Sequence, residues 1–252
     1  MVLVRTQHNH LLNAFTGAEK DRLFPHLEWV PLELGDVLYD TNEKQNHVYF
    51  PTDAIVSLLY VTEDGSSAEI SMVGNEGMIG IALLTGDGTM PNRAVVQNPG
   101  HAFRIKGNLM RREFARKERL HDMLLRYAQT LFAQTAQTAV CNRFHTVDQQ
   151  LCRWLLLSMD RLESDEITMT QELIANMLGV RREGVTEAAG RLQKATVIKY
   201  RRGHIKVLDR LRLEKNCCEC YEAVKRESER MLDFPLPLSG RVVPISVQVS
   251  AR

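Results

Sequence analysis

The chain has 252 residues, of which 44% are hydrophobic and 25% are charged, and its formal net charge is +1. This length favours two folded units over one, and the composition excludes disordered, collagen-like and membrane-embedded chains. No apolar run approaches the roughly 18 residues of a membrane-spanning helix and the N-terminus has no signal-peptide pattern, so we expect a cytoplasmic protein with no membrane partner.

Short β-rich runs separated by Gly, Asp, Asn and Pro occupy residues 29–105. The runs are VPLEL, VLYD, HVYF, AIVSLLYV, AEISMV, RAVVQ and HAFRI. Many short strands at regular spacing are typical of a compact antiparallel barrel or sandwich. We therefore predict a β-rich N-terminal domain over residues 1–107.

Glycine and proline are absent between Asn108 and Phe144, which predicts one long helix over residues 108–145. Apolar residues recur along it at alternating spacings of four and three, as in a coiled-coil seam. Such a stripe packs either on its own domain or against a second copy of the helix, and the pattern leaves both open. The candidate dimer contacts are Leu120, Leu124, Tyr127 and Leu131.

A helical domain is predicted over residues 146–232, followed by an irregular tail at 233–252 that is rich in proline. Its first helix spans about Val147–Arg161. Thr170 then caps a second helix that runs to Gly179. A third helix follows from about Arg181 to Lys194, at the spacing of a helix-turn-helix.

Two short β-runs, 197–200 and 205–208, follow the helix pair and predict a hairpin, or wing. Between Thr168 and Lys215 there are eleven Lys/Arg and five Asp/Glu, an excess of six positive charges in a nearly neutral chain. A solvated basic face would have the same composition. Together with the helix pair and the wing, however, the charge predicts binding to double-stranded DNA.

The segment Thr170-Gln-Glu-Leu-Ile-Ala-Asn-Met-Leu-Gly-Val-Arg-Arg-Glu-Gly-Val-Thr-Glu resembles the DNA-binding signature of the Crp/Fnr regulators. The likeness extends over nearly the whole chain. It implies an α+β fold in which a β-roll sensor (a double-stranded β-helix, or jelly roll, of the cyclic-nucleotide-binding kind) precedes a long dimerisation helix and a winged helix-turn-helix. It also implies a homodimer on a pseudo-palindromic operator, with RNA polymerase as a further partner.

Position by position, the resemblance places the family's base-reading pair on Arg182 and Glu183. Receptor-type members carry a further Arg where this chain has Glu187, so its operator should differ from theirs. Glu187 could instead repel phosphate or face solvent. The candidate DNA contacts are Thr170, Gln171, Arg181, Arg182, Glu183, Glu187, Arg191, Arg201 and Arg202.

The segment that begins at Gly74 resembles the family's phosphate-binding region, but Ile81 stands where the family has a ribose-binding Glu. An unpaired buried hydroxyl costs on the order of 1–3 kcal/mol, so we expect weak or no binding of cyclic AMP. The effector stays unidentified. The candidate effector contacts are Glu76, Gly77, Arg93 and Ala94.

The five cysteines are expected to be thiols, because their number is odd and their spacing irregular. Cys217, Cys218 and Cys220 could not all face one ion from a helix, so we expect no metal and no cofactor. No nucleophile–base set or phosphate loop is present, so we expect no enzyme. The alternative function is a cyclic-nucleotide-binding-like module that regulates a partner protein.

Overall fold

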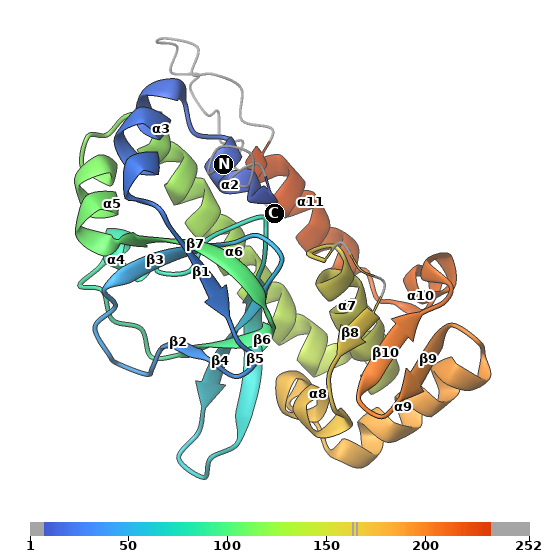
Figure 1. Cartoon of the computed structure of the whole chain (residues 1–252). Coiled ribbons are helices and arrows are strands. Elements are labelled where there is room, and N and C mark those ends of the chain that lie inside the picture. The colour runs from blue at the N-terminus through green and yellow to red at the C-terminus, as the bar shows by residue number, and fades with distance from the viewer. Residues whose placement is uncertain (1–7, 163, 165, 233–252) are drawn as a thin grey trace, which may run out of the picture.

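The computed structural model describes residues 8–162, 164 and 166–232 (Figure 1). The predicted irregular tail at 233–252 lies outside the described residues. Within the described residues, no helix is long and apolar enough to cross a membrane. The mixture of helix and strand predicted from the sequence is confirmed.

Two antiparallel sheets form the N-terminal domain, and every β-run predicted from the sequence is a strand. The strand orders are β1-β7-β3 and β2-β6-β4-β5, and the side chains between the sheets, such as Val56 and Ala102, are fully buried. The strands are β1 (Glu28–Leu32), β2 (Val37–Tyr39), β3 (His47–Pro51), β4 (Ile55–Val61), β5 (Ser67–Val73), β6 (Arg93–Asn98) and β7 (Gly100–Lys106).

Short helices that the sequence analysis did not predict flank these strands. The start of one of them had a sequence signal, because Thr16 and Glu19 form a capping box. The short helices are α2 (His10–Asn13), α3 (Gly17–Leu23), the 3₁₀ helix η2 (Phe24–His26) and α4 (Ala82–Thr85).

The single helix predicted over 108–145 is two helices, α5 (Gly107–Phe114) and α6 (Arg119–Phe144). The chain turns between them, with Lys117 at φ 57°. A tertiary contact fixes the start of α6, because Glu19 of α3 accepts a hydrogen bond from the Leu120 amide at 2.9 Å. Neither glycine nor proline marks this break, so the sequence pattern predicted a continuous helix.

The face of α6 that was predicted to contact a second chain packs on the chain's own β-domain. Leu120, Leu124 and Tyr127 are each 1% exposed or less and belong to one core with side chains of β3, β7 and α5. The Tyr127 hydroxyl donates to the Met78 carbonyl at 2.7 Å, and Leu131 is half-buried against the same core. For Leu120, Leu124 and Tyr127 the prediction of a dimer contact is therefore wrong, because periodicity does not reveal which neighbour covers a stripe, whereas for Leu131 it stays a prediction.

The opposite side of α6 carries a second stripe that is exposed. Phe132 is 75% exposed and Leu125 44%. With Ala139, these residues recur every seven positions, and the exposed Gln129 and Ala136 lie between them. We call these five residues the outer stripe of α6.

The C-terminal domain lies beside the four-stranded sheet and the end of α6, and its helix α8 packs against β5 (Figure 1). Thr146 and Gln149 form a capping box that starts its first helix. A short strand that the sequence analysis did not predict, β8, pairs with β10 and widens the wing to three strands. The elements are α7 (Val147–Met159), β8 (Glu166–Thr168), α8 (Gln171–Leu178), α9 (Arg182–Lys194), β9 (Ile198–Arg201), β10 (His204–Val207), α10 (Arg210–Asn216) and α11 (Cys220–Leu232).

One apolar core joins the two domains. It contains Leu59 and Met72 of the β-domain together with Trp154 of α7 and Ile174 of α8. A buried carboxyl group, Glu69, lies at this boundary and accepts a hydrogen bond from the Ser57 hydroxyl at 2.5 Å. The domains therefore meet through packed side chains rather than through a linker alone.

Burial raises the pKa of Glu69 to about 7, although Ser57 and the charges of Arg153 and Arg161 oppose the shift. The folded state thus holds a proton that the unfolded chain releases above its ordinary pKa of 4.5. We expect stability to be full below about pH 4.5 and to fall as the pH rises through 7, by up to about 3 kcal/mol. Glu69→Gln should remove this loss, as measured by urea unfolding at pH 5.5 and pH 8.

Glu63→Gln serves as the control, because Glu63 is exposed in the β4–β5 turn. It should keep the pH dependence of the wild type. Equal pH dependence in Glu69→Gln and wild type would show that Glu69 is ionised in the folded protein.

Candidate nucleic-acid interface

Helices α8 and α9 form a tight pair. The Thr170 hydroxyl accepts a hydrogen bond from the Leu173 amide at 3.2 Å and so caps α8. Gly179 ends α8 at φ 64°, a left-handed conformation that glycine adopts at little cost. Arg181 then has extended backbone and serves as the N-cap of α9. The helix therefore begins at Arg182, one residue later than predicted.

The two sides of α9 differ as the sequence pattern predicted. Its inner side is buried in the domain core, while Arg182, Glu183 and Glu187 are exposed. This arrangement leaves a row of charged side chains on a rigid helix. The buried residues are Val185, Ala188, Ala189 and Leu192.

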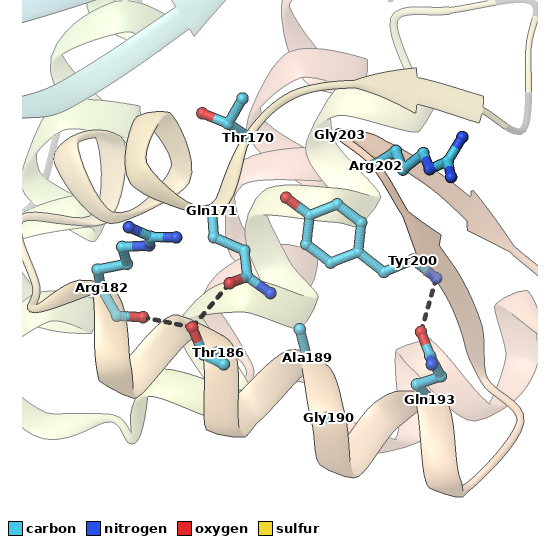
Figure 2. A pocket seen from close by; sticks show the side chains of 10 residues that line it. All are labelled: Thr170, Gln171, Arg182, Thr186, Ala189, Gly190, Gln193, Tyr200, Arg202 and Gly203. Carbon is cyan, nitrogen blue, oxygen red and sulfur yellow. Dashed lines mark hydrogen bonds between the residues drawn. The ribbon is translucent and has the colours of Figure 1, made fainter.

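A hollow of about 430 Å³ separates α9 from the wing (Figure 2). On the helix side, Thr186 donates to the Gln171 side chain at 2.7 Å and to the Arg182 carbonyl at 3.0 Å. Figure 2 shows these groups converging from α8 and α9. The first turn of α8 and the outer side of α9 are therefore held in one fixed arrangement.

The wing side of the hollow is tied to α9 and to the strand before α8. The Tyr200 amide donates to the Gln193 side chain at 2.9 Å, and the Tyr200 hydroxyl donates to the Met169 carbonyl at 2.8 Å. Burial raises the pKa of Tyr200, so its hydroxyl stays a donor. Sequence reasoning missed Thr186, Gln193 and Tyr200, although Thr186 and Gln193 share a helical stripe with Arg182.

The wing turn carries two arginines. Arg201 ends β9, and Arg202 and Gly203 both have positive φ, 53° and 84°, as in a type I′ hairpin turn. Arg202 lines the hollow opposite Arg182. Helix, hollow and wing together present guanidinium groups that can donate paired hydrogen bonds to phosphates or to guanine.

Arg191 lies one helical turn after Glu187 on α9, and its guanidinium is 3.6 Å from the Glu187 carboxylate. Its guanidinium forms a two-point ion pair with Asp148 of α7, at 2.7 and 2.6 Å, which lowers the pKa of Asp148. Arg191 therefore braces α9 against α7, and we remove it from the candidate DNA contacts.

A second site lies within the β-domain, where a cavity of about 280 Å³ separates the strands from α6. The described residues that line it include none with a charged side chain, and Ile81 is among them. Both polar side-chain atoms of Gln45, and the amide nitrogen of Asn92, are buried there without a hydrogen-bond partner in the described structure. Buried polar atoms are rarely left unpaired, so these two amides mark a place for a ligand or for water.

None of the candidate effector contacts lines this cavity. Glu76 pairs with Arg161, which follows α7, at 2.7 Å, and Gly77 packs against Tyr127, where a Cβ would come within 2.4 Å of the ring. Arg93 pairs with Asp40 at 3.3 Å, and Ala94 is buried between the sheets. None of the four residues lines the cavity, and their assignment to an effector site stays a prediction.

Comparisons with known proteins agree with this architecture. Residues 149–215 match the model of the Crp-like helix-turn-helix domain, and residues 29–117 match that of the cyclic nucleotide-binding domain. Together the two segments span more than half of the chain. Among curated proteins, none matches the sequence.

Solved structures share the fold over nearly their full length. A protein assigned to the Crp/Fnr family from Eubacterium rectale matches with a TM-score of 0.66 at 17% identity, covering 83% of this chain and 98% of its own. FixK2 from Bradyrhizobium japonicum matches with 0.63 at 15%, covering 76% and 98%. A CRP-family transcriptional regulator from Thermus thermophilus matches with 0.62 at 16%, covering 74% and 95%.

Proposed function

Since this chain is a Crp/Fnr-type transcription regulator that binds DNA through its helix-turn-helix, we propose that it acts as a homodimer on a pseudo-palindromic operator. The observation that carries the proposal is the basic surface of α9 and the wing, where Arg182 and Arg202 line one hollow and the exposed Arg201 precedes Arg202 in the wing. We assign base reading to Arg182 and Glu183. Phosphate contacts are assigned to Thr170, Gln171, Arg181 and the wing arginines.

The test is an electrophoretic retardation assay with the DNA upstream of the protein's own gene, at increasing salt. Affinity should fall steeply with salt, because each phosphate contact releases counterions. Failure to bind any upstream fragment at low salt would count against control of its own gene.

Dimerisation is assigned to the outer stripe of α6. Exposed apolar side chains at heptad spacing on a long helix can pair with the same stripe of a second chain. To meet successive major grooves, the two copies of α9 in such a dimer must lie about 34 Å apart. The division into a sensor at residues 1–107, connecting helices at 108–145 and a DNA-binding domain at 146–232 is part of this proposal, as are RNA polymerase as a partner and a cytoplasmic location.

We assign the effector site to the cavity of the β-domain. The effector would be an uncharged molecule whose polar groups form hydrogen bonds with the side-chain amides of Gln45 and Asn92. The lining offers no cation for a cyclic phosphate and no acid for a ribose hydroxyl. We therefore expect calorimetric titration with cyclic AMP to give no measurable binding. A dissociation constant in the micromolar range or below would contradict this assignment.

Arg202→Asn should remove a positive charge from the wing without destabilising the fold. Asn tolerates positive φ better than Arg, so the free energy of unfolding should stay constant or rise by up to about 1 kcal/mol. Affinity for every DNA sequence should fall, and the slope of log K against log salt should decrease by about 1. Fluorescence anisotropy at several salt concentrations, together with urea unfolding, measures both.

The matched control is Lys117→Asn, which removes one positive charge at another exposed residue with positive φ, between α5 and α6. It should leave DNA binding unchanged. An equal loss of affinity in both variants would mean that net charge, rather than the wing, sets the effect.

A further inference from the structure

Four metal-binding side chains meet where α6 ends. Cys141 and His145 lie one helical turn apart at the end of α6, and Cys218 and Cys220 come from the segment that joins α10 to α11. One ligand atom from each lies within 4.8 Å of the other three. The three cysteines are at most 5% exposed, and His145 is half-buried.

The prediction that these cysteines could not share an ion assumed that they lie in one helix. The structure differs, because α10 ends at Asn216 and α11 begins at Cys220. Cys218 therefore lies outside both helices, and its sulfur can turn toward α6. Cys217 packs against these cysteines but is not one of the four, and its sulfur lies 4.0 Å from the Gln149 carbonyl oxygen.

The separations fit one tetrahedral ion. The sulfurs of Cys141 and Cys218 are 3.6 Å apart, and the Cys220 sulfur lies 3.4 Å from Nδ1 of His145. Zinc bonds of about 2.3 Å to sulfur and 2.0–2.1 Å to nitrogen place tetrahedral ligands about 3.8 and 3.5 Å apart. A disulfide would require about 2.05 Å between sulfurs, and an iron–sulfur cluster would hold its ligands farther apart than a single ion does.

The surrounding residues suit a metal centre with three thiolates. Nε2 of His145 lies 3.3 Å from the Glu219 carboxylate, which would leave Nδ1 facing the cysteines, as in carboxylate–histidine–zinc triads. Gln137 donates to the Cys220 sulfur at 3.0 Å. The buried guanidinium of Arg153 lies close enough to interact with Cys141 and would offset the negative charge of the thiolates.

We propose that Cys141, His145, Cys218 and Cys220 bind one Zn²⁺ ion that fastens the DNA-binding domain to the end of α6. Zinc favours this set of ligands and the closed four-coordinate geometry of a structural site. The thiols lose their protons to solvent on binding. Because α11 lies along α6 (Figure 1) and its Met231 reaches the sensor core, the ion would hold the junction between sensor and DNA-binding domain in one arrangement.

The first test is the zinc content of the full-length protein, measured by inductively coupled plasma mass spectrometry after growth in zinc-supplemented medium. We expect about one zinc per chain, the capacity of one closed four-ligand site. Cys220→Ser should lower the content at least tenfold. Cys217→Ser, which changes a neighbouring thiol outside the set, should keep it.

The second test uses wild-type protein in which cobalt replaces zinc, so it does not depend on how the variants fold. Tetrahedral coordination by thiolates should give strong visible d–d bands and a near-ultraviolet charge-transfer band. Glu219→Gln should weaken zinc binding by about tenfold through the orientation of His145, whereas Glu222→Gln on α11 should not.

Three results would overturn the proposal. They are wild-type protein without stoichiometric zinc after reconstitution, equal zinc loss in Cys217→Ser and Cys220→Ser, and iron–sulfur absorbance in protein purified without oxygen. Failure of DNA binding in the retardation assay would leave the zinc content unaffected, so the two proposals can fail separately.

Discussion

Phe132→Glu is expected to convert the protein to a monomer and to lower its affinity for a two-half-site operator by about 10²-fold or more. The side chain is 75% exposed in the single chain, so the substitution should leave the fold intact. In the proposed dimer it would place two carboxylates in an apolar seam without partners. The loss is large because linkage of two half-site contacts raises overall affinity by about 10²–10⁴.

Sedimentation equilibrium measures the mass, and circular dichroism confirms that the variant is folded. Leu34→Glu is the matched control, because Leu34 is 50% exposed after β1 and is not part of the outer stripe of α6. Phe132→Leu should stay dimeric. A dimeric Phe132→Glu protein would show that another surface joins the two chains.

Arg182→Ala is expected to cost roughly 1–3 kcal/mol of binding free energy on the preferred operator and to relax the preference at one base pair. Arg182 is the first residue of α9, is exposed, and lines the hollow that faces the wing. A guanidinium there can donate two hydrogen bonds to one guanine, and alanine leaves that base unread.

Arg201→Ala provides the contrast, because a phosphate contact carries no sequence information. It should weaken binding to all sequences alike. Anisotropy titrations against a set of operators with single base-pair changes distinguish the two patterns. Equal losses on every operator for both variants would remove Arg182 from base reading.

Much of the fold followed from local sequence patterns. The β-runs between Gly, Asp, Asn and Pro predicted the strands of the N-terminal domain, and Thr170, Gly179 and the buried Val185 marked the helix-turn-helix. These signals are short-range. A strand shows a period of two and a helix a period of 3.6, and caps and turns lie within a few residues of what they end.

The effector contacts could not be placed by position alone. Glu76 and Arg93 matched the resemblance in sequence, yet ion pairs with Arg161 and Asp40 hold them away from the cavity. The amides of Gln45 and Asn92 gave no motif, and we propose them as effector contacts only because they are buried without hydrogen-bond partners in the described structure. Ion pairs and hydrogen bonds between side chains that are distant in the sequence depend on how the elements pack, and the spacing of residues in the sequence does not reveal this packing.

By itself, the sequence determined the strands of the N-terminal domain and the order of the helix-turn-helix and wing, and it predicted base reading by Arg182 and Glu183. Only the tertiary structure decided which side of α6 is covered, and it placed Cys141 beside Cys218. The physical reason is the same in both cases. Helical periodicity predicts that a stripe will be buried. Which surface covers the stripe depends on the free energy of packing between elements that are far apart in the chain.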